Sequence, residues 1–245
     1  MGFLTPDDPG YDPEVRQSGF NRYRQCLSFY AASWLKVNLL TVLGALPLAA
    51  VIALSVLSSS VLLLLPGAFV CGMLFGPFLA GLYDAVLRGL RDDSAHWRDA
   101  WKKSWRQNGR ESLLAGGFLG LLLGVYTFMA ALLWWSAVPP TAGTLALYTF
   151  ALFLLLAVTT LYWPQMVLFR QTAGNRLRNA LLFTVKYFWR VVGVTLLQML
   201  YILLYVLFAP WTVLLVPFLG LWYIVFVAQF LLYEPLNREL RIEQR

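Results

Sequence analysis

The chain has 245 residues, of which 60% are apolar and 13% are charged, with a mean hydropathy of +0.66 and a net charge of +7. This composition excludes an ordinary soluble globular protein. A basic excess also occurs in nucleic-acid-binding proteins. Here, however, the basic residues lie beside long apolar blocks and not along a soluble domain, so we expect no nucleic-acid partner.

Three blocks contain no Asp, Glu, Lys or Arg: residues 37–83, 112–169 and 191–233, with lengths of 47, 58 and 43 residues. A helix needs about 20 apolar residues to cross a hydrocarbon core roughly 30 Å thick, so each block is long enough for two crossings. A closed β-barrel would need short alternating segments instead. The sequence therefore predicts an all-α polytopic membrane protein with six transmembrane helices in three hairpins.

The blocks also set the expected domain boundaries. Residues 1–33 are expected to form a disordered tail and an interfacial helix, residues 34–233 a six-span transmembrane domain, and residues 234–245 a cytoplasmic tail. The expected spans are about 37–57, 61–83, 113–135, 144–169, 191–209 and 212–233, with cytoplasmic loops at 84–111 and 170–190.

The basic residues indicate the orientation of the chain. All nineteen Lys and Arg residues precede the first block, follow the last, or lie in 84–111 and 170–190, so they share one side of the predicted topology. By the positive-inside rule that side is the cytoplasm. We expect a multi-pass protein of the bacterial inner membrane with both termini in the cytoplasm and with anionic lipid at its cytoplasmic face.

The loop at 84–111 carries a regular aromatic and basic pattern. Tryptophan recurs every four residues on one helical face, and basic residues take the other. This pattern predicts an amphipathic helix lying on the membrane surface. Its aromatic residues are Trp97, Trp101 and Trp105, and its basic residues are Arg98, Lys102, Lys103 and Arg106.

Small residues and prolines mark the expected packing of the spans. Gly116, Gly120 and Gly124 form a small-residue stripe, which allows close approach of a helix either from the same chain or from a second copy in a homo-oligomer.

Prolines within or beside the spans are expected to kink them. Such kinks occur in transporters with broken helices and in membrane helices generally. The residues are Pro47, Pro66, Pro77, Pro164 and Pro217.

Two further patterns leave alternatives open. The segments PFLAGLY (77–83) and PFLGLWY (217–223) resemble each other, so the hairpins are candidates for a repeated unit. Four amides lie in or beside the spans, where they can bond neighbouring helices or a sugar. These amides are Asn38, Gln165, Gln198 and Gln229.

Catalytic patterns are missing from the sequence. The single histidine, His96, lies near Asp92, Asp93 and Asp99, where acidic residues are favourable at a helix start. There is no HExxH, GxSxG or Gly-rich phosphate loop, and no His next to a Ser or Cys nucleophile. We therefore expect no enzyme activity, no cofactor and no metal.

Several segments together resemble the YesL-like family of bacterial membrane proteins. They are NLLTVLGALPL (38–48), GPFLAGLY (76–83), WRDAWKKSWRQN (97–108) and LYWPQMVLFRQTAGNRLRNALLF (161–183). The resemblance implies the multi-pass topology and a carbohydrate uptake or utilisation context, and it supplies no active-site residues. The expected function is that of a non-enzymatic accessory or partner-binding protein, with a membrane transporter as the candidate partner. The alternative is a carrier or channel for a small neutral solute such as a sugar.

Overall fold

The computed structural model describes residues 17–93, 96–136 and 139–240, and this part of the chain is helical without any strand. It confirms the expected all-helical fold. The predicted tail at 1–16 and the last residues, 241–245, lie outside the described residues. The elements are α1 (Gly19–Leu57), α2 (Val61–Leu90), α3 (Trp97–Trp135), α4 (Ala142–Leu168), α5 (Ala173–Lys186), α6 (Phe188–Leu207), the 3₁₀ helix η1 (Trp211–Leu215), the π-helical turn η2 (Val216–Gly220) and α7 (Trp222–Leu240).

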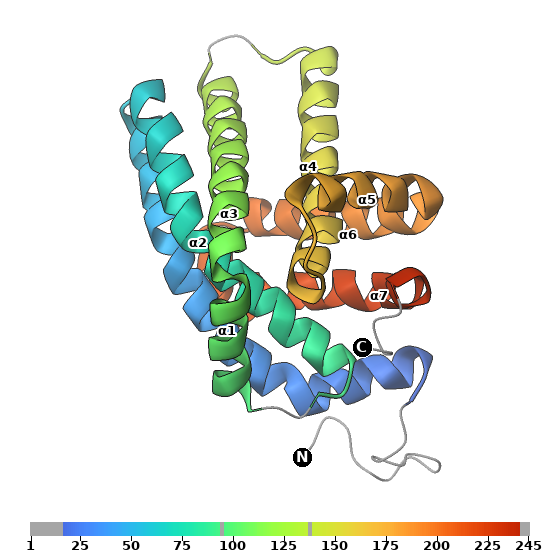
Figure 1. The fold of residues 1–245 in the computed structure, drawn as a ribbon. Helices are drawn as coiled ribbons and strands as arrows, with labels where there is room; N and C mark the ends of the chain where they lie inside the picture. Colours follow the sequence, from blue (N-terminus) through green and yellow to red (C-terminus); the bar gives the residue numbers. More distant parts are fainter. Residues whose placement is uncertain (1–16, 94–95, 137–138, 241–245) are drawn as a thin grey trace.

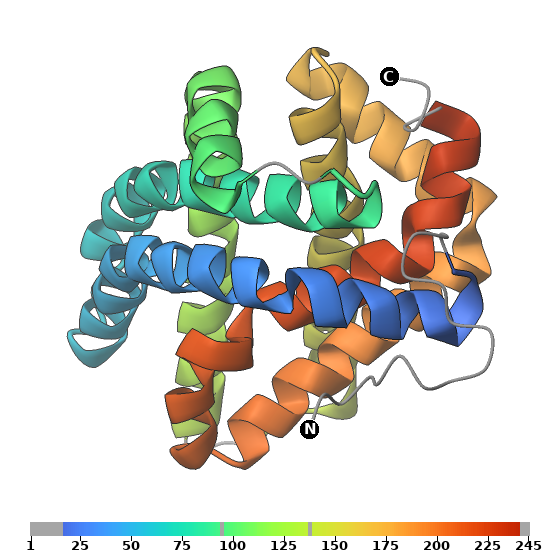
Figure 2. The same ribbon diagram turned by 90° about the horizontal axis from the view of Figure 1, so that it is seen from below.

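Five helices are long and apolar enough to cross a membrane: α1, α2, α3, α4 and α6. The expected sixth span is not one straight helix, because 211–220 and 222–239 are bent relative to each other by 52°. Figures 1 and 2 show that α6 and α7 run across the direction of α3 and α4. Five to six apolar helices are consistent with a multi-pass membrane protein, whereas the cytoplasmic orientation of the termini stays a prediction.

Helix boundaries differ from the expected ones at four places, the first being α2, which continues to Leu90 instead of ending near Tyr83. The interfacial helix and the first span are one continuous helix, α1, and the Trp-striped helix continues without a break into the third span as α3. Between Trp97 and the third span, Gly109 is the only weak breaker, at a cost of about 1 kcal/mol, which does not end a helix. At the other end, α7 continues through Pro235 to Leu240 instead of ending near Tyr233.

Contacts with the end of α5 and the start of α6 fix this extended end of α7. Glu239 accepts hydrogen bonds from Lys186 Nζ at 2.6 Å and from the Tyr187 hydroxyl at 2.7 Å. The bond to Glu239 raises the pKa of Lys186 above its ordinary value. A second ion pair joins Arg190 to Glu234 at 3.2 Å.

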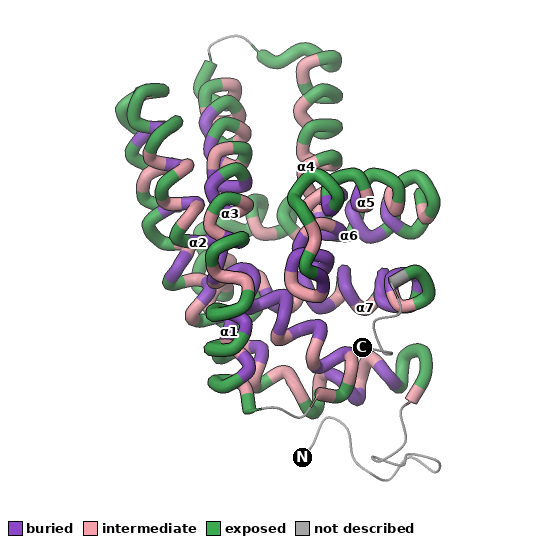
Figure 3. Tube along the Cα trace, viewed as in Figure 1, coloured by how far each residue is buried: buried purple, intermediate pink, exposed green. Residues whose placement is uncertain are grey.

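The main core lies where α1, α2, α4 and α7 meet, as the buried segments in Figure 3 show. Trp34 of α1 is fully buried there, its ring packs on Trp222 and Phe226 of α7, and its Nε1 donates to the Ala85 carbonyl of α2 at 3.0 Å. The upper turns of α3 and α4 and the outer face of α6 carry exposed apolar side chains. Such a surface suits contact with lipid.

The glycine stripe of α3 faces α2 of the same chain. A Cβ added to Gly116 would lie 2.4 Å from the Gly72 carbonyl oxygen, and one added to Gly120 would lie 2.5 Å from the Ala68 carbonyl oxygen. A Cβ on Gly124 would lie 2.8 Å from the Cβ of Ala68. The helix backbones are therefore in direct contact, and α2 occupies the stripe that a second copy would need in a homodimer.

We expect Gly116→Ala to destabilise the protein by about 1–3 kcal/mol, because the added methyl group forces α2 and α3 apart. Gly193→Ala is the matched control, since a Cβ at this helical position of α6 meets nothing within 4 Å. The control should be neutral or more stable by up to about 1 kcal/mol. Thermal unfolding in detergent micelles measures both variants, and equal stability of the two would contradict the α2–α3 contact.

Candidate functional site

The break between η2 and α7 is bonded on both sides by the side chain of Asn38 from α1. Its Nδ2 donates to the carbonyl oxygens of Val216, at 3.2 Å, and Pro217, at 2.7 Å. Its Oδ1 accepts from the backbone N–H groups of Leu221, at 3.2 Å, and Trp222, at 3.0 Å. Asn38 is fully buried, and its one amide bonds four backbone groups around the break.

Two other side chains complete the bonding of the break. The Tyr201 hydroxyl of α6 donates to the Leu219 carbonyl at 2.8 Å, and Trp222 Nε1 donates to the Phe218 carbonyl. Backbone groups without partners are costly in an apolar environment, and irregular backbone at membrane depth persists where protein surrounds it. The hydrogen bonds from Asn38, Tyr201 and Trp222 therefore stabilise the break as a defined part of the fold.

A cavity of about 350 Å³ lies beside this break, between α2, α3, α4, α6 and α7. We call it the Gln198 cavity. Its walls are apolar for the most part, with Phe75 from α2, Leu119 from α3, Ile202 from α6 and the backbone of Gly220 at the break. None of the residues that line it is charged. Its volume lies in the range of small-molecule sites.

One polar pair marks a wall of this cavity. Gln198 of α6 is 6% exposed, and its Nε2 and Oε1 lie 2.9 Å and 3.1 Å from the Thr160 hydroxyl of α4. Gln229 of α7 donates to the backbone carbonyl of the same Thr160 at 3.0 Å. The pair therefore joins three helices, and Gln198 also faces the cavity.

A second apolar groove adjoins the Gln198 cavity. It has a volume of about 330 Å³, lies between α3 and α4, and is lined by residues such as Tyr126, Met129 and Tyr148. Leu155 of α4 lines both the groove and the Gln198 cavity. We call this second groove the α3–α4 groove.

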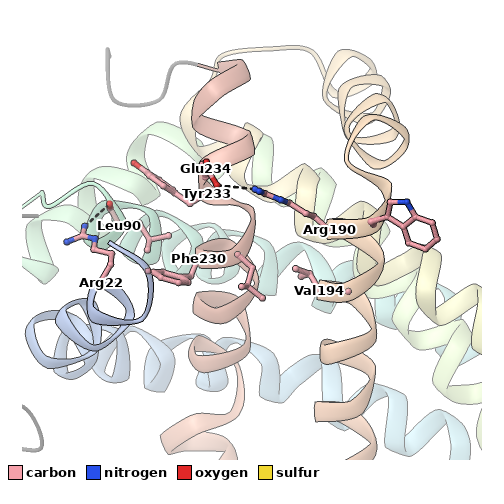
Figure 4. Close-up of a pocket in the computed structure, with 11 residues that line it drawn as sticks. Arg22, Leu90, Arg190, Val194, Phe230, Tyr233 and Glu234 are labelled. Carbon is pink, nitrogen blue, oxygen red and sulfur yellow. Dashed lines mark hydrogen bonds and ion pairs between the residues drawn. The ribbon is translucent and has the colours of Figure 1, made fainter. Parts of the chain in front are cut away.

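Figure 4 shows a third cavity, of about 530 Å³, around α7. Arg22 of α1 and Arg190 of α6 reach it from either side of α7. Arg22 donates to the Leu90 carbonyl at 3.0 Å and pairs with Asp92 at 2.8 Å, and Arg190 pairs with Glu234. Because both guanidinium groups are bonded to the protein and do not converge, this cavity offers no shared anion site.

The Trp stripe contacts α2 through Trp101 and Trp105, but Trp105 is 37% exposed, and contact of the stripe with lipid stays a prediction. The ring of Phe78 lies 6.1 Å from that of Trp101 and 4.9 Å from that of Trp105, and Trp101 also covers Gly81. Trp97 lies under the cation of Lys36 at 5.8 Å. Sequence periodicity found the apolar face of the helix but could not tell which surface covers it. The expected basic residues, Arg98, Lys102, Lys103 and Arg106, are all exposed.

Four of the five expected kink prolines stay inside continuous helices: Pro47 in α1, Pro66 and Pro77 in α2, and Pro164 in α4. Pro217 alone lies at a break, in η2. The two similar segments that begin at Pro77 and Pro217 therefore fold differently, one as regular α-helix and one across the break.

Two further residues singled out in the sequence, Gln165 and His96, have a local role or none. Gln165 is buried and donates to the Leu161 carbonyl of its own helix at 2.9 Å. His96 is exposed and directly precedes α3. Within the described residues, no group of His, Cys, Asp and Glu side chains could hold a metal ion.

The comparisons with known proteins identify no relative: no family model, no curated protein and no solved structure matches this chain. The resemblance to the YesL-like family therefore stays a prediction.

We expect Asn38→Leu to lower the free energy of unfolding by about 3 kcal/mol, because four backbone groups around the break lose a hydrogen-bond partner. Gln165→Leu is the control, since this equally buried amide bonds only its own helix and its Oε1 has no partner in the described structure. The control should change stability by less than about 1 kcal/mol. Thermal unfolding of the two purified variants tests this, and an equal loss in both would show that Asn38 does not hold the break.

Proposed function

We propose that this protein is a non-enzymatic multi-pass membrane protein that binds a small neutral solute in the Gln198 cavity. The observation that carries the proposal is an uncharged cavity walled by five helices and by the backbone of a broken helix. Uncharged walls favour a neutral ligand, because a buried charge without a partner is costly.

The position of the cavity supports a carrier or channel as the wider role. Secondary transporters place their binding sites beside discontinuous helices, where irregular backbone lines a cavity. Here Val216, Gly220 and Leu221 bring the broken segment into the cavity wall. Lining residues without charge favour a solute that moves without a coupled ion held by a carboxylate.

The exposed basic face of α3 supports a contact with anionic lipid. Arg98, Lys102, Lys103 and Arg106 lie on the outer side of its first turns, away from α2, and each such residue near an anionic membrane adds about 1 kcal/mol. This contact agrees with a cytoplasmic position for that end of the helix. The accessory role in carbohydrate uptake and the transporter partner rest on the family resemblance, and both remain proposals.

Binding of tritiated neutral solutes, from glucose to dodecanol, to protein in phosphatidylcholine nanodiscs tests the proposal. We expect at least one solute to bind wild-type protein above empty nanodiscs. Gln198→Leu should weaken that binding about three- to tenfold through the lost hydrogen bond, whereas Gln165→Leu, outside the cavity, should leave it unchanged. Binding of no solute in the series would contradict the proposed function.

A further inference from the structure

The Gln198 cavity and the α3–α4 groove adjoin each other at one side chain. They share the side chain of Leu155, which lines both. The residues that line the groove include Leu122 and Leu147, whose exposed fractions of 55% and 66% place them on the outer surface of the helices. The cavity is also lined by Val206, which is 66% exposed, so a ligand in the lipid phase can reach either space.

Polar side chains besides Gln198 also line the cavity, among them Tyr83, Tyr201 and Tyr205. The hydroxyl of Thr159 donates to carbonyls of its own helix, at Leu155 and Leu156, and the hydroxyl of Tyr201 donates to Leu219 at the break. A sugar needs several hydrogen bonds at once, because each buried hydroxyl left unpaired costs free energy. The hydroxyls of Thr159 and Tyr201 are thus engaged within the protein and less available to a polyol.

Gln198 keeps hydrogen-bonding capacity that its neighbours do not use. A side-chain amide has two N–H donors and two acceptor lone pairs. Even if the Thr160 hydroxyl makes both of its contacts with Gln198, one N–H and one lone pair remain available on a side chain that is 6% exposed and faces the cavity. This buried amide, with apolar walls beside it and an apolar groove adjoining the cavity, matches one polar head on an apolar chain.

Building on the proposed function, we infer that the ligand is a neutral single-chain amphipathic molecule, of the class of long-chain alcohols. Its head bonds to Gln198, and its chain passes Leu155 into the α3–α4 groove. The uncharged lining of both spaces excludes a charged head as the best partner. The apolar groove supplies the hydrophobic contact along the chain.

Leu155 and Leu154 provide a matched pair of variants for the test. Leu155→Trp fills the junction between the two spaces, whereas Leu154 is 43% exposed and lines neither of them. The probe is a photoreactive dodecanol with a diazirine at the end of the chain, added to protein in nanodiscs, with labelled peptides mapped by mass spectrometry. Excess dodecanol, dodecane and glucose serve as competitors.

We expect labelling of residues that line the α3–α4 groove, competition by dodecanol, weaker competition by dodecane and none by glucose. Labelling should be lost in Leu155→Trp, should be retained in Leu154→Trp, and should fall about three- to tenfold in Gln198→Leu. Equal labelling of the two Trp variants would overturn the inference about the chain. Gln198-dependent binding of glucose without dodecanol binding would also overturn it and would leave the proposed function standing, whereas binding of neither would end both.

Discussion

The architecture depends on one requirement: a helix that breaks in apolar surroundings must still satisfy its backbone groups. Asn38 meets it by bonding two carbonyls before the break and two N–H groups after it. The same contact joins α1 to the last helix and sets the direction in which α7 leaves η2. The ring of Trp34, one turn before Asn38, then packs on Trp222 and Phe226, so the break and the main core hold each other in place.

The break also forms part of the cavity wall. The chain bends by 52° there, α6 and α7 run across α3 and α4, and η2 contributes Val216 and Gly220 to the lining of the cavity. The opposite side is rigid for a different reason, since Gly116 and Gly120 bring α3 into backbone contact with α2. A rigid helix pair facing a fixed break gives a preformed space, which reduces the entropic cost of binding a ligand.

Sequence reasoning predicted the features that depend on long-range composition. Charge-free blocks of 43 residues or more predict membrane-length helices, and five such helices are present. By contrast, where a helix bends and which surface covers its apolar face depend on residues that are distant in the sequence. PFLAGLY and PFLGLWY look alike, but only the second segment meets Asn38 and breaks. The Trp stripe has the period of a surface helix, and two of its rings also contact Phe78 and Gly81 of α2, a contact that no local pattern reports.

Hydrogen exchange at the break tests the central claim most directly. In bilayer nanodiscs, the amides of Leu221 and Trp222 should exchange as slowly as those in the middle of α2, because both donate to Asn38 Oδ1. In the Asn38→Leu protein the same two amides should exchange much faster, while the amides of α2 stay protected. Rapid exchange at Leu221 and Trp222 in the wild-type protein, or exchange that the substitution does not change, would contradict the account.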